Sequence, residues 1–151
     1  MTEANGSTDA KCGLKIDPLL AKSGECPYET IEWERRRAEI LDGEGNVIFE
    51  QDDIEVPSGW SMLAANIVSS KYFYGEKKTD EREYSVRQLV HRVARTVTDW
   101  GTKDGFFASP LDADNYYKEL SSICLNQHGS FNSPVWFNVG IGSTYGHTSN
   151  S

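Results

Sequence analysis

The stretch SVRQLVHRVARTVTDWG, residues 85–101, predicts the fold more clearly than any other part of the chain. Its apolar side chains recur at the spacing of one helix face, as in an amphipathic helix that packs on a core. They are Val86, Leu89, Val90, Val93, Ala94, Val97 and Trp100. Ser85 can cap the first turn while the Gln88 side chain reaches back to it, and Gly101 supplies a stop. We therefore expect a capped amphipathic helix here.

Two further helices are expected on either side of this one. The first begins near Ser58 and ends before Gly75, with one apolar stripe. That stripe comprises Trp60, Leu63, Ala64, Ile67 and Val68. The second runs from about 110 to 127, because Ser109 is a good N-cap and Pro110 suits the first helical position. Its apolar face comprises Ala113, Tyr116, Tyr117, Leu120, Ile123 and Cys124.

Before these helices, RAEILDGEGNVIFEQ (37–51) reads as two strands around a turn of residues that tolerate positive φ, which predicts a β-hairpin. The fold class is therefore mainly α: a small helical domain of about three amphipathic helices with an N-terminal β-hairpin. Residues 1–30 are expected to form a disordered or irregular lead, because they begin with a small, polar, aperiodic run. The helical domain is expected over 31–140, followed by a separate tail over 141–151.

Composition excludes several classes of function. A net charge of −8 over 151 residues, without a dominant basic segment, argues against broad affinity for nucleic acid or anionic membranes. No apolar run approaches membrane-spanning length and no secretion signal is recognisable, so the cytoplasm is the expected compartment. The three cysteines, Cys12, Cys26 and Cys124, form no CxxC pair, so neither a disulfide framework nor a metal site is predicted. Cys124 lies on an apolar helix face and is expected to behave as a small buried hydrophobe.

The aromatic stretch FNSPVWFN, residues 131–138, is the strongest candidate for a site. The residue before a proline is biased away from the helical region, so a turn passing into an extended segment is expected at residues 128–140. Ser133 offers a hydroxyl, and with its neighbours it offers backbone N–H groups that could hold an anionic oxygen such as a phosphate. Alternatively, the turn only makes a corner while Val135, Trp136 and Phe137 pack into the core.

Four stretches, taken in order, resemble a known family. They are WSMLAANIVSSKYFYG (60–75), REYSVRQLVHRVARTVTDWG (82–101), GFF (105–107) and DADNYYKELSSICLNQHGSFNSPVWFNVG (112–140). Together they resemble the N-terminal region of class II ribonucleotide reductases, the adenosylcobalamin-dependent enzymes that make deoxyribonucleotides. The resemblance covers about residues 33–140, and FNSPVWFN is its most distinctive piece. It implies that residues 31–140 are the N-terminal helical domain of such a reductase.

The resemblance implies a radical reaction that reduces a ribonucleotide to a deoxyribonucleotide for DNA synthesis. In the family, homolysis of cobalamin's carbon–cobalt bond generates a cysteine thiyl radical, which takes the 3′-hydrogen while two further cysteines supply electrons. The family pattern assigns Ser133 to substrate binding, with Asn132 and Pro134 as its supports, and it places no catalytic residue in this chain. A ribonucleoside diphosphate is the expected substrate, with the triphosphate left open.

In the family, the catalytic cysteines and the adenosylcobalamin site lie on a ten-stranded α/β barrel that follows this region. Residues 141–151 resemble the start of a loop before the barrel, so a truncated product or one piece of a split enzyme is expected, inactive alone. Its expected partner is a reductase barrel domain or second chain. The alternative is a non-catalytic binding or regulatory module that docks on a separate reductase chain, and a structural protein with no link to the reductase is a third hypothesis.

Overall fold

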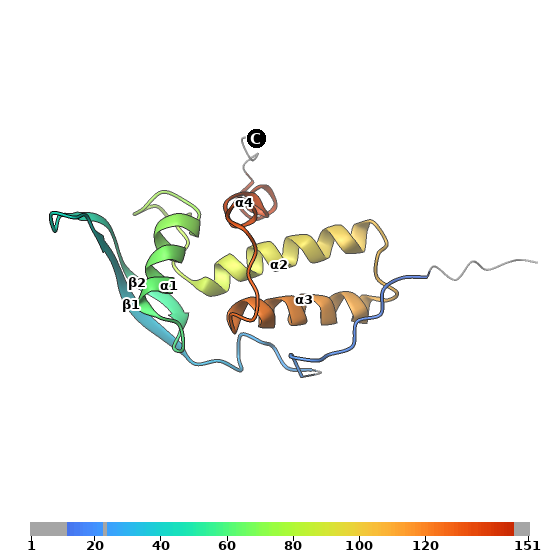
Figure 1. The fold of residues 1–151 in the computed structure, drawn as a ribbon. Coiled ribbons are helices and arrows are strands. Elements are labelled where there is room, and N and C mark those ends of the chain that lie inside the picture. Colours follow the sequence, from blue (N-terminus) through green and yellow to red (C-terminus); the bar gives the residue numbers. More distant parts are fainter. Residues whose placement is uncertain (1–11, 23, 147–151) are drawn as a thin grey trace, which may run out of the picture.

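The computed structural model describes residues 12–22 and 24–146, and it has a β-hairpin at one end and packed helices beside it (Figure 1). In chain order the elements are β1 (Trp33–Leu41), β2 (Val47–Pro57), α1 (Met62–Ile67), the π-helical turn η1 (Val68–Tyr72), α2 (Val86–Lys103), α3 (Pro110–Leu125), α4 (Ser133–Asn138) and α5 (Ile141–Tyr145). The predicted class, a small and mainly helical domain with an N-terminal hairpin, is confirmed.

The hairpin of β1 and β2 is longer than the predicted span of 37–51 on both sides. Its strands pair antiparallel, and one face contributes Ala38, Ile54 and Val56 to the core with no exposed surface. At the base of the hairpin, Ser85 and Glu55 of β2 form an isolated parallel β-bridge. This bridge connects the hairpin to the start of α2.

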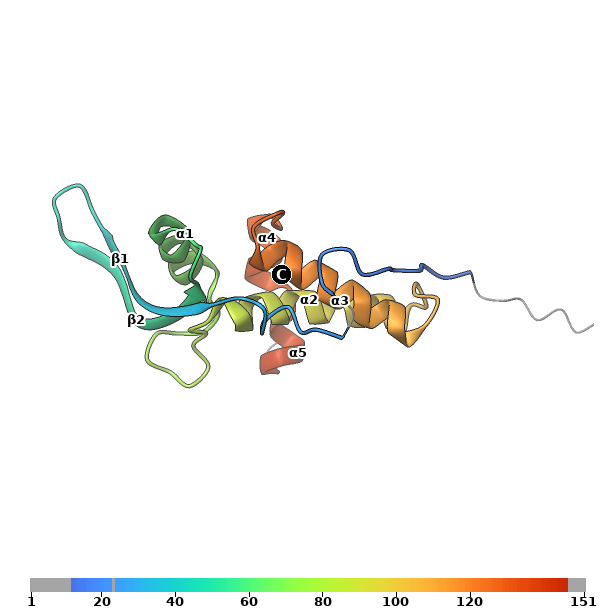
Figure 2. The ribbon, with the colours of Figure 1, turned by 90° about the horizontal axis from the view of Figure 1, so that it is seen from below.

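Helices α2 and α3 pack against each other along their length and form the centre of the molecule (Figures 1 and 2). Both predicted starts are confirmed, because Ser85 and Gln88 form a complete capping box and the Ser109 side chain accepts from the backbone of α3. One member of the predicted stripe is wrong: Trp100 is 53% exposed, since it lies in the last turns of α2, beyond most of the core.

The predicted helix after residue 58 begins later and is irregular. Ser61, rather than Ser58, caps α1, and the helix changes into the π-helical turn η1 at Val68. Leu63, placed in the predicted stripe, is 69% exposed and does not belong to the buried core cluster.

The core lies where the hairpin, α1, η1, α2 and the end of α3 meet. Buried members of this cluster include Ile54, Val56, Phe73, Leu89, Val93, Leu125 and Trp136. Cys124 belongs to it and is 6% exposed, which confirms the expectation of a buried hydrophobe. Burial raises the pKa of the Cys124 thiol to about 11, so the thiolate that would act as a nucleophile is disfavoured.

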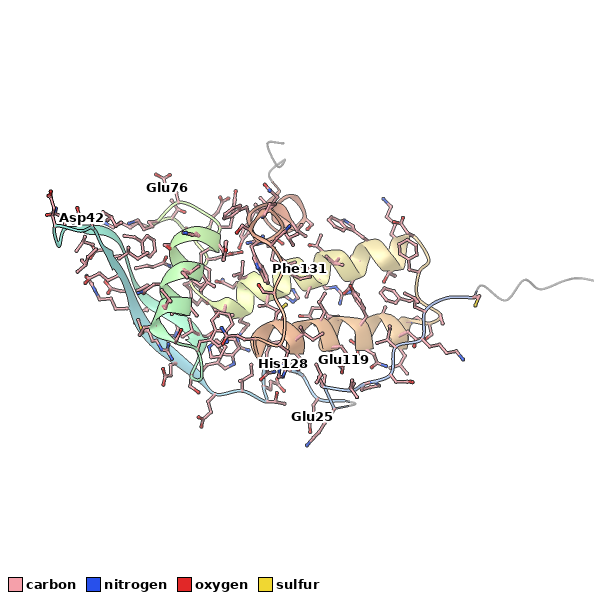
Figure 3. All side chains as sticks on the ribbon, in the orientation of Figure 1. Glu25, Asp42, Glu76, Glu119, His128 and Phe131 are labelled. Carbon is pink, nitrogen blue, oxygen red and sulfur yellow. The ribbon has the colours of Figure 1, made fainter. Side chains whose placement is uncertain are left out.

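The described residues of the lead form neither helix nor extended ladder, yet they are fixed along α3 (Figure 2). Leu14 exchanges backbone hydrogen bonds with Phe106 and Ala108. Farther along, the Glu119 carboxylate accepts the N–H groups of Leu19, Leu20 and Ala21 at 2.8–3.1 Å (Figure 3). The expected disorder of the first ten residues lies outside the described residues.

After α3 the chain crosses α2 and forms two short helices (Figure 1). The predicted extended segment is wrong, because residues 133–138 are helical. Asn132 caps α4, and burial of Trp136 on its inner face outweighs the pre-proline bias at Ser133. The tail also continues as α5, whose first residue, Ile141, is buried.

Candidate functional site

Ser133 is the first residue of α4, and its side chain is partly buried. Its hydroxyl oxygen lies 3.0 Å from the hydroxyl oxygen of Tyr72, the last residue of η1. The structure thus brings together two hydroxyl groups that lie 61 residues apart in the chain. Sequence reasoning singled out Ser133 but missed Tyr72.

Asn132 and Pro134 surround Ser133 in different ways. The Asn132 side-chain oxygen accepts a hydrogen bond from the Val135 N–H. The Asn132 backbone carbonyl oxygen accepts from the N–H groups of Val135 and Trp136. Pro134 has no N–H at all. Most of the backbone donors that a bound anion would use are therefore occupied within α4, which leaves the Ser133 hydroxyl as the main polar group that this turn can offer.

Aromatic rings pack around the Tyr72 side chain of this pair. The Tyr72 ring centroid lies 5.4 Å from that of Phe137 and 6.5 Å from that of Trp136. Phe131, on the crossing segment labelled in Figure 3, packs edge-on against Trp136. The alternative in which this stretch only packs into the core holds for Trp136, which is buried, but not for Phe137, which remains 44% exposed.

A mainly apolar pocket of about 360 Å³ lies next to this cluster. Tyr72 and Trp136 form part of its wall, together with Trp60 from the turn before α1 and Leu89 from α2. Ser133 does not line the pocket. The hydroxyl pair and the pocket are therefore neighbouring features that share the Tyr72 side chain.

A buried ion pair between Glu83 and Arg92 joins α4 to α2. Glu83 and Arg92 expose 0% and 2% of their surfaces, and Arg92 Nε donates to Glu83 Oε1 at 2.7 Å. The same guanidinium donates to the carbonyl oxygens of Trp136, at 3.1 Å, and Val139, at 2.7 Å. Arg92 thus fixes the end of α4 to α2.

The Glu83 carboxylate also accepts two further hydrogen bonds. The Tyr74 N–H donates to it at 2.9 Å, and the Tyr145 hydroxyl of α5 donates at 3.0 Å. Burial and the negative charge of Glu83 raise the pKa of Tyr145, which keeps the phenol protonated as the donor. Sequence reasoning missed this network, because a charged residue next to an apolar stripe is normally assigned to the surface.

The histidines of the described residues lie away from this site. His91 is exposed, and its Nδ1 lies 2.6 Å from the Tyr117 hydroxyl on α3. His128 is exposed at the end of α3 (Figure 3). Within residues 12–22 and 24–146, no group of three His, Cys, Asp or Glu side chains could hold a metal ion. In the same part of the chain, no helix is both long and apolar enough to cross a membrane.

Comparison with known proteins shows the family of this chain. Residues 34–127 match the family model described as class II vitamin B12-dependent ribonucleotide reductase, over more than half of the chain. This chain belongs to that family. The reductase family expected from FNSPVWFN and its flanking helices is thereby confirmed, although Ser133 itself lies just beyond the matched range.

Relatives in several bacteria carry the same name, vitamin B12-dependent ribonucleotide reductase. The one from Rhodopirellula baltica is 53% identical over 89% of this chain, and the one from Streptomyces coelicolor is 44% identical over 88%. A more distant one, from Bradyrhizobium diazoefficiens, is 30% identical over 88%. The chain spans only 13–14% of the length of these relatives and corresponds to their N-terminal part.

Proposed function

We propose that this chain is the N-terminal portion of a vitamin B12-dependent ribonucleoside-diphosphate reductase, which converts ribonucleotides to deoxyribonucleotides in the cytoplasm. Family membership over residues 34–127 is the observation that carries the proposal. The catalytic cysteines belong to the barrel domain with which this chain assembles, either in one polypeptide or as a second chain. Alone, the chain has no reductase activity.

The part of the reaction that this chain supplies is a substrate contact at Ser133. Its hydroxyl donates a hydrogen bond to an oxygen of the ribonucleotide, while Asn132 caps α4 and Pro134 stiffens its first turn. Because Arg92 donates hydrogen bonds to the carbonyl oxygens of Trp136 and Val139, the backbone of α4 that carries Ser133 is held in place before substrate arrives. A prepositioned donor loses less conformational entropy on binding than a mobile one.

Adenosylcobalamin is the cofactor of the complete enzyme and supplies the radical that starts the reaction. The described side chains form no cluster of metal-ligating groups, and we assign none of them to the cofactor. What this chain contributes is positioning of the substrate.

The test uses a complete reductase in which this chain replaces the aligned N-terminal part of the Rhodopirellula baltica relative. Activity must require both adenosylcobalamin and the barrel, and the 151-residue chain alone must show none. Ser133→Ala is expected to raise KM for the ribonucleotide by about 3- to 10-fold, the loss expected for one hydrogen bond. The exposed Thr144→Ala on α5 is the matched loss of a hydroxyl and should leave KM unchanged.

Two results would count against the proposal. An inactive but folded hybrid, with normal adenosylcobalamin binding by the barrel, would indicate that this chain does not serve a reductase. An unchanged KM in Ser133→Ala would remove the substrate contact while leaving the family assignment intact. Testing both the diphosphate and the triphosphate in the same assay decides which substrate the enzyme uses.

A further inference from the structure

Tyr72 lies at the end of an unusual backbone feature, the π-helical turn η1. The Phe73 N–H donates at 2.9 Å to the carbonyl oxygen of Val68, five residues back, instead of to Ser69, four residues back. Such turns are rare, and they occur frequently at functional sites. They accommodate one extra residue, which rotates the following side chains by about 100° relative to a regular α-helix.

Neighbouring side chains stabilise this turn. Because Phe73 bypasses the carbonyl oxygen of Ser69, Arg82 can donate to that oxygen, and a second nitrogen of Arg82 donates to the Phe73 carbonyl at 2.6 Å. Arg92 donates to the Tyr72 carbonyl at 3.4 Å. Two arginines thus hold the backbone on both sides of the point where the Tyr72 side chain leaves it.

The Tyr72 ring has equally defined surroundings. It packs against Trp136 and Phe137 of α4, and its hydroxyl meets the Ser133 hydroxyl. In a hydrogen bond between two hydroxyl groups, one group donates its proton and the other accepts, so the accepting group keeps its own proton free for another partner. The phenol is much more acidic than the serine hydroxyl, so the favoured arrangement has Tyr72 donating to Ser133.

We propose that Tyr72 is a positioning residue for the substrate contact: its hydroxyl donates to the Ser133 oxygen and directs the Ser133 proton toward an oxygen of the bound ribonucleotide. Without that donor, the Ser133 hydroxyl can rotate and accept from other groups. The π-helical turn places the Tyr72 hydroxyl against α4 for this purpose. The inference rests on the proposed function of Ser133 and extends it to a second residue.

The experiment is a double-mutant cycle in the same hybrid reductase. It compares Tyr72→Phe, Ser133→Ala and the variant carrying both, with Tyr116→Phe as the control. Tyr116 lies on α3, where its ring packs against Phe107, away from the hydroxyl pair. Steady-state kcat and KM for the ribonucleotide are measured for each variant. Thermal melting of the 151-residue chain checks that Tyr72→Phe shifts the midpoint by no more than about 4 °C.

The expected result is that Tyr72→Phe raises KM by about 3- to 10-fold with kcat nearly unchanged, because it removes a contact that serves ground state and transition state alike. On the Ser133→Ala background, Tyr72→Phe should add nothing, since its effect passes through Ser133. A merely structural role would lower the melting midpoint and would persist on that background.

Three results would overturn the inference. One is an unchanged KM in Tyr72→Phe while Ser133→Ala raises it, which would leave the Ser133 contact standing without Tyr72. Another is a combined effect equal to the product of the two single effects. The third is an unchanged KM in Ser133→Ala, which removes the substrate contact and the role of Tyr72 with it.

Discussion

Replacing Arg92 with Met should destabilise the domain more than any other single change at an arginine. Met fills a similar volume but cannot donate hydrogen bonds. The substitution leaves the Glu83 carboxylate, which has no exposed surface, without its positive partner. It also removes the donors that the carbonyl oxygens of Trp136 and Val139 now have.

The expected loss is about 3–5 kcal/mol, the usual cost of removing one partner of a buried ion pair. That is a large part of the roughly 5–15 kcal/mol by which a domain of this size is stable. Arg95→Met is the matched control on the same helix. Arg95 pairs with Asp99 four residues on, both are partly exposed, and such a pair contributes only about 0.3–0.5 kcal/mol.

Urea unfolding of the 151-residue chain, followed by tryptophan fluorescence, gives the free energy of unfolding for each variant. A Glu83→Gln/Arg92→Met variant should lose less than the sum of its two single changes, because each single change already breaks the pair. The reasoning is refuted if Arg92→Met costs no more than Arg95→Met, or if the two losses at positions 83 and 92 simply add.

Two further predictions concern the lead and α5. Burial raises the pKa of Glu119, but the hydrogen bonds that its carboxylate accepts from the N–H groups of the lead lower that pKa by more. The folded-state pKa of Glu119 therefore lies below the ordinary 4.5. The stabilisation from docking the lead is therefore fully present above pH 4.5 and lost as pH falls through that lowered pKa. In NMR titrations the amide shifts of Leu19 to Ala21 should move with a midpoint below 4.5 and stay flat in Glu119→Gln; a midpoint at or above 4.5 would contradict this. Gly140→Ala should cost about 2–4 kcal/mol, because its φ is +82° and a Cβ would lie 2.6 Å from the Arg92 carbonyl oxygen. Gly105→Ala, with a φ of +74° and open space around it, should cost only about 1–2 kcal/mol in the same urea assay, and equal losses would exclude the clash as a cause.

The parts of the fold that could be predicted are those with local signals. Helices α2 and α3 carry their caps, Ser85 and Ser109, and their apolar periods within a single stretch of sequence. Helix α4 had a comparable signal that the pre-proline rule concealed: Asn132 followed by Pro134 is an N-cap with a proline in the first turn, as Ser109 and Pro110 are for α3. Weighing the cap above the proline would have predicted it.

The rest depends on contacts between distant segments, which periodicity does not reveal. Nothing local to Arg92 indicates that Glu83 will meet it in the core. Nothing in VSSKY (68–72) indicates a π-helical turn, whose bypassed carbonyl group accepts from the distant Arg82. For the candidate site, the family resemblance selected Ser133, whereas its neighbour Tyr72 emerged only when η1 and α4 were placed side by side.

The docking of the lead on α3 has a consequence for the order of events during protein synthesis. The Leu19 N–H and the Glu119 carboxylate that accepts it are separated by 100 residues. A ribosome adds about 5–20 residues per second. After making the lead it therefore needs roughly 5–20 seconds to make the part of α3 on which the lead docks. The hairpin and α1 are synthesised in that interval and can pair locally, so the lead is made before them but is fixed in place after them.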